Sequence, residues 1–198
     1  SRTDLDAFAL QSQQRAAYAQ QQGYFDEQIV PLTVPAGRSE VLFNRDEHIR
    51  ADTSLDSLAQ LKPAFKRDGI VTAGNASGLN DGAAALLLTS RFEADKRGLK
   101  PQARIVGYAF AGVEPGIMGL GPIPAVQQVL AQTGLTVADL DVIESNEAFA
   151  AQALAVSHTL GFDNRKVNPN GGAIAMGHPV GATGSILIIK LLAELKRI

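Results

Sequence analysis

The sequence predicts an α/β protein in which helices cover mixed sheets. Two observations support this fold class: strand-like and helical segments alternate along the second half of the chain, and the composition is that of an ordinary globular protein. Of the 198 residues, 45% are hydrophobic and 19% are charged, which provides apolar surface for a buried core and argues against disorder. A chain of this length forms one large domain or two small ones.

The first half is predicted to begin with a long helix. Apolar and small residues recur at helical spacing over residues 3–22, Gly23 ends the run, and Ser1 or Thr3 is the expected cap. The helix is rich in glutamine, which we interpret as a solvated face. Two strands are expected at residues 28–34 and 40–43, around a turn at residues 35–37. A short helix capped by Asp52 or Thr53 is expected at residues 53–61. A buried strand at residues 83–89 and a charged surface helix at residues 90–98 complete this half.

Lys100-Pro101 is the predicted boundary between the two halves. Beyond it, predicted strands alternate with predicted helices, which is typical of parallel strands with covering helices. The strands are expected at residues 103–110, 141–144 and 167–168, and the helices at residues 124–132, 149–161 and 183–196.

Charge and cysteine content exclude several classes of function. The chain carries 18 Lys plus Arg against 20 Asp plus Glu, a net charge of −2, so no basic excess favours nucleic acid or an anionic membrane surface. It contains no cysteine, which excludes disulfides, thiolate metal sites and a cysteine nucleophile within the chain. No apolar run approaches the length of a membrane span. We expect a cytoplasmic protein.

Residues 168–185 are unusually rich in glycine and lead into an apolar helix. Glycine lets a backbone approach a ligand closely, and the first amides of the next helix point back toward this segment. His178 lies in the segment and precedes Pro179, which restricts the histidine's backbone. A P-loop is excluded because His178 stands where lysine is required. The segment predicts either a rigidly held functional imidazole or simply a tight connection.

A second polar segment, Asn-Glu-Ala-Phe at residues 146–149, follows a predicted strand. Ligands gather at the carboxyl ends of strands in open α/β sheets, so Asn146 is a candidate site residue. The simpler alternative is that Asn146 caps a helix beginning at Ala148. Glu144 and Glu147 could form a paired-carboxylate site, but we favour first-turn charges stabilised by the helix dipole.

A third segment, residues 72–82, is a loop of small residues whose backbone could bind an extended polar ligand. A plain turn between two elements is the alternative. His48 lies in a charged stretch and is expected at the surface, and His158 lies inside a predicted helix. The three histidines share no metal-ligand spacing, so we predict no metal site.

Together these three segments resemble the thiolase family. Residues 146–149 are similar to its asparagine motif, residues 171–184 (Gly-Gly-Ala-Ile-Ala-Met-Gly-His-Pro-Val-Gly-Ala-Thr-Gly) to its histidine motif, and residues 72–82 to its pantetheine loop. The resemblance runs over essentially the whole chain. It is closest to the short-chain acetyl-CoA acetyltransferase branch.

The resemblance implies roles for two side chains. His178 would be the base that activates a cysteine thiol for attack on an acyl thioester, because the thiolate is the reactive form. His178 would also donate to the thioester oxygen. Asn146 would hold a water that completes this oxyanion site.

The resemblance also implies a set of coenzyme A contacts, with coenzyme A or acyl-CoA as substrate and no tightly bound cofactor. Ser77 and the surrounding loop backbone would contact the pantetheine arm, other residues would wall the acyl pocket, and three more would lie along the nucleotide. The set comprises Ala73, Ala76, Ser77, Gly78, Leu79, Ala148, Phe149, Met176, Arg50, Ser57 and Phe65.

The chain departs from the family in its lack of cysteine. In thiolases the acyl-accepting cysteine lies upstream of the position that matches residue 1, and a second cysteine lies downstream of the position that matches residue 198. We therefore expect a partial chain that is inactive alone. Residues 1–99 would be the end of the N-terminal domain and residues 100–198 most of the C-terminal domain. The full-length protein would be a homodimer or homotetramer.

Two other functions remain as alternatives. The first is a non-catalytic, thiolase-like subunit that binds acyl-CoA or serves as a scaffold. The second is a related decarboxylating condensing enzyme, which Asn146 argues against because that branch usually has histidine at this position.

Overall fold

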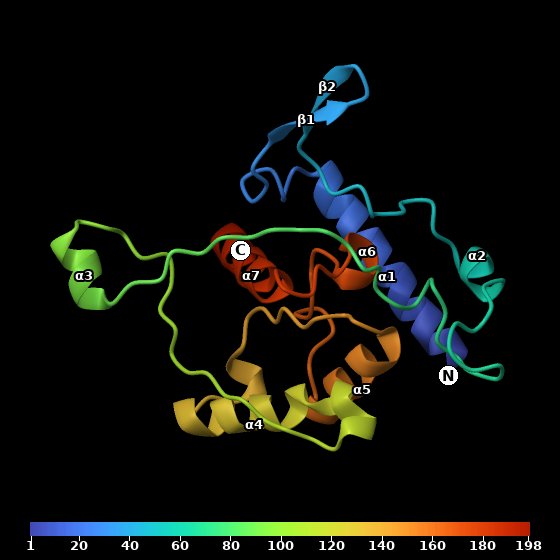
Figure 1. Ribbon diagram of the computed structural model, residues 1–198. Coiled ribbons are helices and arrows are strands. Elements are labelled where there is room, and N and C mark those ends of the chain that lie inside the picture. The colour runs from blue at the N-terminus through green and yellow to red at the C-terminus, as the bar shows by residue number, and fades with distance from the viewer.

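The computed structural model describes residues 1–198, and helices account for most of its regular structure (Figure 1). The elements, in chain order, are α1 (Arg2–Gln21), β1 (Leu32–Ala36), β2 (Ser39–Phe43), α2 (Leu55–Ala59), α3 (Arg91–Lys96), the 3-10 helix η1 (Pro115–Leu120), α4 (Pro122–Thr133), the 3-10 helix η2 (Val137–Asp139), α5 (Ala150–Leu160), α6 (Ala173–Met176) and α7 (Thr183–Arg197).

Helix α1 forms as predicted and lies between α2 on one side and α5 and α6 on the other (Figure 1). Ser1 caps it: the Asp4 amide donates to the Ser1 hydroxyl at 3.3 Å, and the Asp4 carboxylate accepts from the Ser1 amine at 2.7 Å. The prediction of a solvated glutamine face is wrong in part, because Gln13 is only 6% exposed. The side chain of Gln13 lies inside the molecule because it forms hydrogen bonds with other segments of the chain.

The hydrophobic core joins α1 to α2, α5 and α6. The buried cluster consists of Leu5, Ala9, Leu58, Ala150 and Ile174. Alanines at the centre of this cluster let the helix backbones approach one another closely, because they add little side-chain volume between the axes. Leu58 and Ile174 fill the remaining space on either side of α1.

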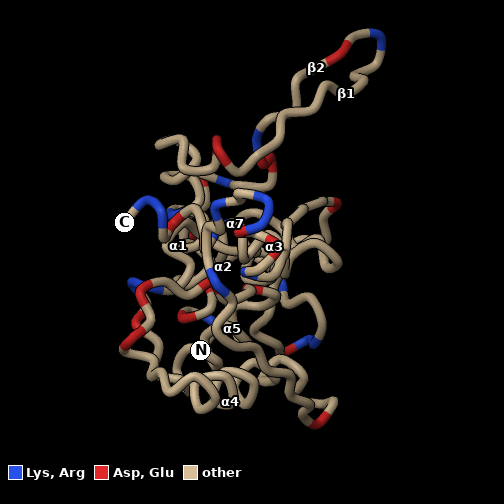
Figure 2. Tube along the Cα trace, turned by 90° about the vertical axis from the view of Figure 1, so that its left-hand side faces the viewer, with Lys and Arg blue, Asp and Glu red and all other residues tan.

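Strands β1 and β2 form an antiparallel hairpin, with Leu32 opposite Phe43 and Ala36 opposite Ser39. The hairpin projects away from the helices (Figures 1 and 2). Both strands were predicted, but the first begins at residue 32 rather than 28. Residues before it continue the turn after α1, where the Gln28 amide donates to the Phe25 carbonyl at 2.9 Å.

The strands predicted at residues 83–89 and 103–110 do not form. Both segments are extended, but neither pairs with another strand of the chain. The prediction of burial at residues 83–89 is also wrong: Leu87 is 84% exposed. An apolar run becomes a buried strand only where another backbone lies alongside to complete its hydrogen bonds.

The parallel arrangement predicted for the second half is reduced to one bridge between Ile143 and Val167. The Ile143 amide donates to the Lys166 carbonyl, and the Asn168 amide donates to the Ile143 carbonyl, both at 2.8 Å. This short contact nevertheless brings the two predicted site segments, which follow residues 143 and 168, next to each other.

The predicted helices are confirmed, and two predicted caps are wrong. Ser54, not Asp52 or Thr53, caps α2, because its hydroxyl accepts the Ser57 amide at 3.1 Å. Helix α5 begins at Ala150, so Asn146 is not its cap. None of the helices combines the length and the apolar character that crossing a bilayer would require.

Candidate active site

The centre of the candidate site is a contact between two side chains 32 residues apart. The Asn146 Nδ2 atom lies 3.2 Å from the His178 Nε2 atom. Asn146 follows the bridge at Ile143, and His178 lies in the loop between α6 and α7. Both residues are half-buried, and the Oδ1 atom of Asn146 is fully buried.

The other nitrogen of the imidazole fixes its tautomer. The His178 Nδ1 atom lies 2.7 Å from the Thr183 hydroxyl, and that hydroxyl donates its single hydrogen to the Pro179 carbonyl at 3.0 Å. With its hydrogen on the Pro179 carbonyl, Thr183 accepts from His178, and this arrangement favours the tautomer with the proton on Nδ1. In this tautomer the Nε2 atom keeps its lone pair, to which the amide of Asn146 donates.

The backbone of the histidine loop rests on residues 72–82. The His178 amide donates to the Gly78 carbonyl at 3.0 Å. Gly177 adopts a φ of 90° and leaves room for the side chain of Asn80, which a Cβ at this position would overlap. A glycine is therefore required directly before the histidine.

The loop at residues 72–82 also pairs with the asparagine segment. The Ser77 amide donates to the Ala148 carbonyl at 3.0 Å, and the Ala150 amide donates to the Asn75 carbonyl at 2.9 Å. Ala76 and Phe149 form an antiparallel bridge there. The structure thus brings all three predicted segments together around one imidazole.

Asn75 holds this loop to α1. It is fully buried; its Oδ1 atom accepts the Thr72 amide at 2.8 Å, and its Nδ2 atom donates to Asp6 at 2.8 Å and to the Ile70 carbonyl at 3.1 Å. Asp6 in turn accepts from Arg2 at 2.7 Å. These contacts attach one side of the loop to α1, while Ala73 and Leu79 remain exposed to solvent.

The predicted coenzyme A residues lie at different distances from this centre. Ala76, Ser77, Gly78 and Ala148 belong to the paired segments just described, and Met176 ends α6 two residues before the histidine. Ala73 and Leu79 are exposed on the outer side of the loop, and Leu79 is 90% exposed.

Three further predicted residues lie around α2. The ring of Phe65 packs edge-on against Phe149, with the ring centroids 6.0 Å apart. The backbone amide of Arg50 donates to Gln13 at 2.8 Å, which ties its segment to α1. The Ser57 hydroxyl donates to the Ser54 carbonyl at 2.8 Å within the cap of α2. Only Phe65 of these three contacts a residue of the Asn-Glu-Ala-Phe segment.

An open depression of about 400 Å³ adjoins the histidine loop. Residues 80–84 line one side, and residues 179–182 with Ser185 line the other. The depression shows that the surface beside His178 is recessed and open to solvent.

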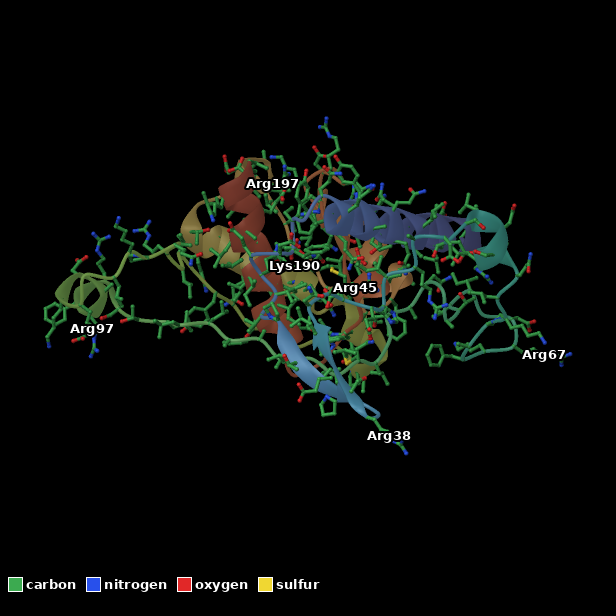
Figure 3. The ribbon with its side chains drawn as sticks, turned by 90° about the horizontal axis from the view of Figure 1, so that it is seen from above. Arg38, Arg45, Arg67, Arg97, Lys190 and Arg197 are labelled. Carbon is green, nitrogen blue, oxygen red and sulfur yellow. The ribbon has the colours of Figure 1, made fainter.

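Glu144 and Glu147 are not first-turn charges, and they do not form a paired-carboxylate site. Glu147 is 2% exposed and accepts from Ser12 at 2.7 Å. Glu144 pairs with Lys190 at 2.9 Å, with the two side chains 2% and 6% exposed. Burial raises the pKa of Glu144, and Lys190 offsets part of this rise. Figure 3 shows Lys190 in the middle of the molecule, whereas Arg38, Arg67 and Arg97 lie at its edges.

The expectation that His48 is merely a surface residue is also wrong. Its half-buried ring packs against Gly78, and its Nδ1 atom lies 3.5 Å from the side-chain nitrogen of Asn80. Desolvation, and then the charge of Arg50, lower the pKa of His48. The charged residues around it in the sequence gave no sign of this position.

The fold and the paired side chains define an α/β protein built around an imidazole and an amide. The chain belongs to the thiolase family: the family model described as "Thiolase, N-terminal domain" matches residues 1–92, and "Thiolase, C-terminal domain" matches residues 99–198. The resemblance inferred from the three motifs is thereby confirmed.

Individual relatives agree with this assignment. The chain is 58% identical over 197 residues to "Acetyl-CoA acetyltransferase" of Chromobacterium violaceum, covering 99% of this chain and 50% of the relative. It is 54% identical over 199 residues to "Beta-ketothiolase BktB" of Cupriavidus necator, covering 100% and 50%. The chain thus spans about half the length of these curated relatives.

Solved structures confirm the fold class. The acetyl-CoA acetyltransferase of Bacillus anthracis superposes with a TM-score of 0.97 at 53% identity, and human mitochondrial 3-ketoacyl-CoA thiolase with a TM-score of 0.93 at 46% identity. Each comparison covers 100% of this chain and 50% of the solved chain.

Proposed function

We propose that this chain is the part of a thiolase that carries its imidazole base, its asparagine and part of its coenzyme A site. The whole protein would transfer acyl groups between coenzyme A thioesters through an acyl-cysteine. The observation that carries the proposal is the 3.2 Å contact between the Asn146 Nδ2 atom and the His178 Nε2 atom, beside the Thr183 hydroxyl that lies 2.7 Å from Nδ1. The names of the relatives support the reaction class.

In the proposed first step, His178 acts as a general base. Its Nε2 atom takes the proton of a cysteine thiol, which the chain itself does not contain. The thiolate attacks the thioester carbonyl, the carbon–sulfur bond to coenzyme A breaks, and the departing thiolate receives the proton from His178. Because Thr183 holds Nδ1–H, the imidazole can make this exchange without turning.

Asn146 would stabilise the negative charge that develops on the thioester oxygen. Its Oδ1 atom is buried and makes no hydrogen bond within the chain, so it can accept one from a bound water. That water, together with the protonated Nε2 atom of His178, would provide two donors for the oxygen. Fixed donors of this kind are a large catalytic contribution in acyl transfer.

Coenzyme A would extend from this centre across residues 72–82. Ala73, Ala76, Ser77, Gly78 and Leu79 would contact the pantetheine arm, mainly through the backbone. A second group would wall the acyl pocket and consists of Ala148, Phe149 and Met176. A third group would lie along the nucleotide and consists of Arg50, Ser57 and Phe65. Phe65 joins the two groups through its contact with Phe149.

The remaining features of the whole protein follow the same proposal. Residues 1–99 would close the N-terminal domain and residues 100–198 would form most of the C-terminal one, which the two family-model matches support. We propose a cytoplasmic homodimer or homotetramer that binds no tightly held cofactor.

Thiolysis of acetoacetyl-CoA by the full-length protein tests the proposal. We expect H178N and N146A to lower kcat by about 10²- to 10⁴-fold, the range typical of lost acid–base or oxyanion groups. H158N is the matched control, because His158 is exposed in α5. The isolated 198-residue chain should show no turnover, since it has no cysteine.

Two results would contradict the proposal. Coenzyme A binding without turnover by the full-length protein would favour the non-catalytic subunit instead. Undiminished turnover in H178N would remove the imidazole from the mechanism altogether.

A further inference from the structure

Glu147 is a buried carboxylate with no cation within hydrogen-bonding distance. Its Oε2 atom accepts from the Ser12 hydroxyl at 2.7 Å and from the Ile174 amide at 3.3 Å, and its Oε1 atom accepts from the Asn168 side chain at 2.8 Å. Burying a charge without a counter-ion costs free energy unless hydrogen bonds replace the lost water. Three donors surround the carboxylate of Glu147, so hydrogen bonds from the protein replace the water that it loses on burial.

The three donors come from the segments that must converge for the site to form. Ser12 belongs to α1, Asn168 starts the glycine-rich segment, and Ile174 lies in α6, four residues before His178. Glu147 itself directly follows Asn146. One carboxylate therefore fixes the distance between the two halves of the imidazole–amide pair.

The surroundings are fitted to a carboxylate. Ser12 accepts the Gly172 amide at 3.0 Å, so its own hydrogen is committed to Glu147. Gly172 packs directly on the carboxylate, which a Cβ at this position would overlap. The three groups that form hydrogen bonds with the two oxygens are all donors. A glutamine here would direct an NH₂ group at one of these donors, so an acceptor-only side chain is required.

We propose that Glu147 is a positioning residue for the proposed acyl transfer, which holds α6 and His178 at the correct distance from Asn146. The proposal rests on the function proposed above, but its main readout does not require activity. Displacement of a reacting group by about 1 Å can cost about 100-fold in rate, so the loss of this carboxylate should reach the chemistry although it touches no substrate.

The test uses the full-length protein with E147Q and S12A. E147Q replaces one accepting oxygen by a donor at constant volume. S12A removes one of the three donors and serves as the milder change if E147Q does not fold. The matched controls are Q14A, an exposed position on the same helix, and E27Q, an exposed glutamate whose partner is Lys196 at the surface.

The first readout is the reactivity of His178 toward diethyl pyrocarbonate, measured by peptide mass spectrometry against His158 as an internal reference. His178 is half-buried and His158 is exposed, so the ratio reports how firmly the histidine loop is held. We expect E147Q and S12A to change this ratio by about threefold or more while the controls leave it unchanged. An unchanged ratio in both variants overturns the proposal.

The second readout is steady-state thiolysis. We expect E147Q to lower kcat by about 10- to 100-fold with KM for acyl-CoA within about threefold of wild type, because the binding loop is not displaced. A loss of kcat without a change in the His178 ratio contradicts positioning through the histidine. If the wild-type protein shows no acyl transfer, the proposed function fails, and the labelling ratio still decides whether Glu147 positions His178.

Discussion

A single hydroxyl group determines which nitrogen of His178 can act as a base. Thr183 is nearly buried, and the Pro179 carbonyl takes its hydrogen, so it can only accept from the imidazole. Without this acceptor, the proton could occupy either nitrogen. In the molecules with the proton on Nε2, the basic lone pair would lie on Nδ1 and point away from Asn146. By holding the proton on Nδ1, Thr183 leaves the lone pair on Nε2, at the far side of the ring.

We therefore expect T183V to lower kcat of the full-length protein by about 10-fold or more, while T183S retains most of the activity. The valine keeps the shape and removes the acceptor. T159V, at an exposed position in α5, is the control. Wild-type activity in T183V, measured by thiolysis, would show that the tautomer is set by another group.

The buried pair of Glu144 and Lys190 makes stability depend on pH. Burial raises the pKa of Glu144 above its ordinary value of 4.5, so the folded state holds this proton more tightly than the unfolded state does. Between 4.5 and the raised pKa, the free energy of unfolding therefore falls as pH rises. We expect this fall to be smaller in E144Q. Denaturant unfolding at a series of pH values measures it, and an identical pH dependence in both proteins would contradict it.

Sequence patterns alone could identify His178 and Asn146, but not the residues that support them. A histidine before proline in a glycine-rich segment is locally conspicuous. Glu147 differs from an ordinary surface glutamate only through Ser12 and Asn168, which lie 135 and 21 residues away. Such contacts depend on the folded arrangement of segments, so no local pattern reveals them.

At the scale of elements, the longer helices could be predicted, whereas α6, the two 3-10 helices and most of the strands could not. A helix satisfies its backbone hydrogen bonds within its own residues, so the spacing of apolar residues largely defines α4 and α7, and spacing with the Ser1 cap defines α1. A strand requires a neighbour. Residues 83–89 have the composition of a buried strand but no partner within the chain, and the same holds for residues 103–110.

Entry into α6 depends on the absence of a side chain at residue 172. A Cβ there would overlap the carboxylate of Glu147, so we expect G172A to lower the free energy of unfolding by about 1–3 kcal/mol. G116A is the control, because a Cβ at Gly116 has no neighbour within 4 Å. Equal stability of the two variants in urea unfolding would show that α6 tolerates a shift.

Considered as a whole, the molecule buries little of itself. Only 28 of 198 residues are buried, which is few for a chain of this length. The apolar side chains left outside include Leu87 at 84% and Phe110 at 86% exposure, in the two unpaired extended segments. Since the chain spans half the length of its relatives, we expect the rest of a full-length protein to cover these segments.

The double variant L87S/F110S tests this expectation. In the isolated chain it should leave thermal stability unchanged and reduce binding of a hydrophobic dye. In the full-length protein it should lower the free energy of unfolding by about 1.5–3 kcal/mol per side chain, as for buried apolar residues. V156S, at a residue that is 1% exposed, should destabilise both forms. Equal effects of L87S/F110S on the two forms would contradict the expectation.

The joints between α1 and the site loops are made of polar groups: Asp6, Ser12, Gln13 and Arg15 bind residues of the loops by hydrogen bonds. Apolar contacts weaken as water cools, whereas hydrogen bonds do not share this dependence. Near freezing, the apolar cluster around Leu5 should therefore weaken more than the hydrogen bonds between α1 and the site segments. We therefore expect the candidate site to stay ordered in the cold, because hydrogen bonds rather than apolar contacts join its segments to α1.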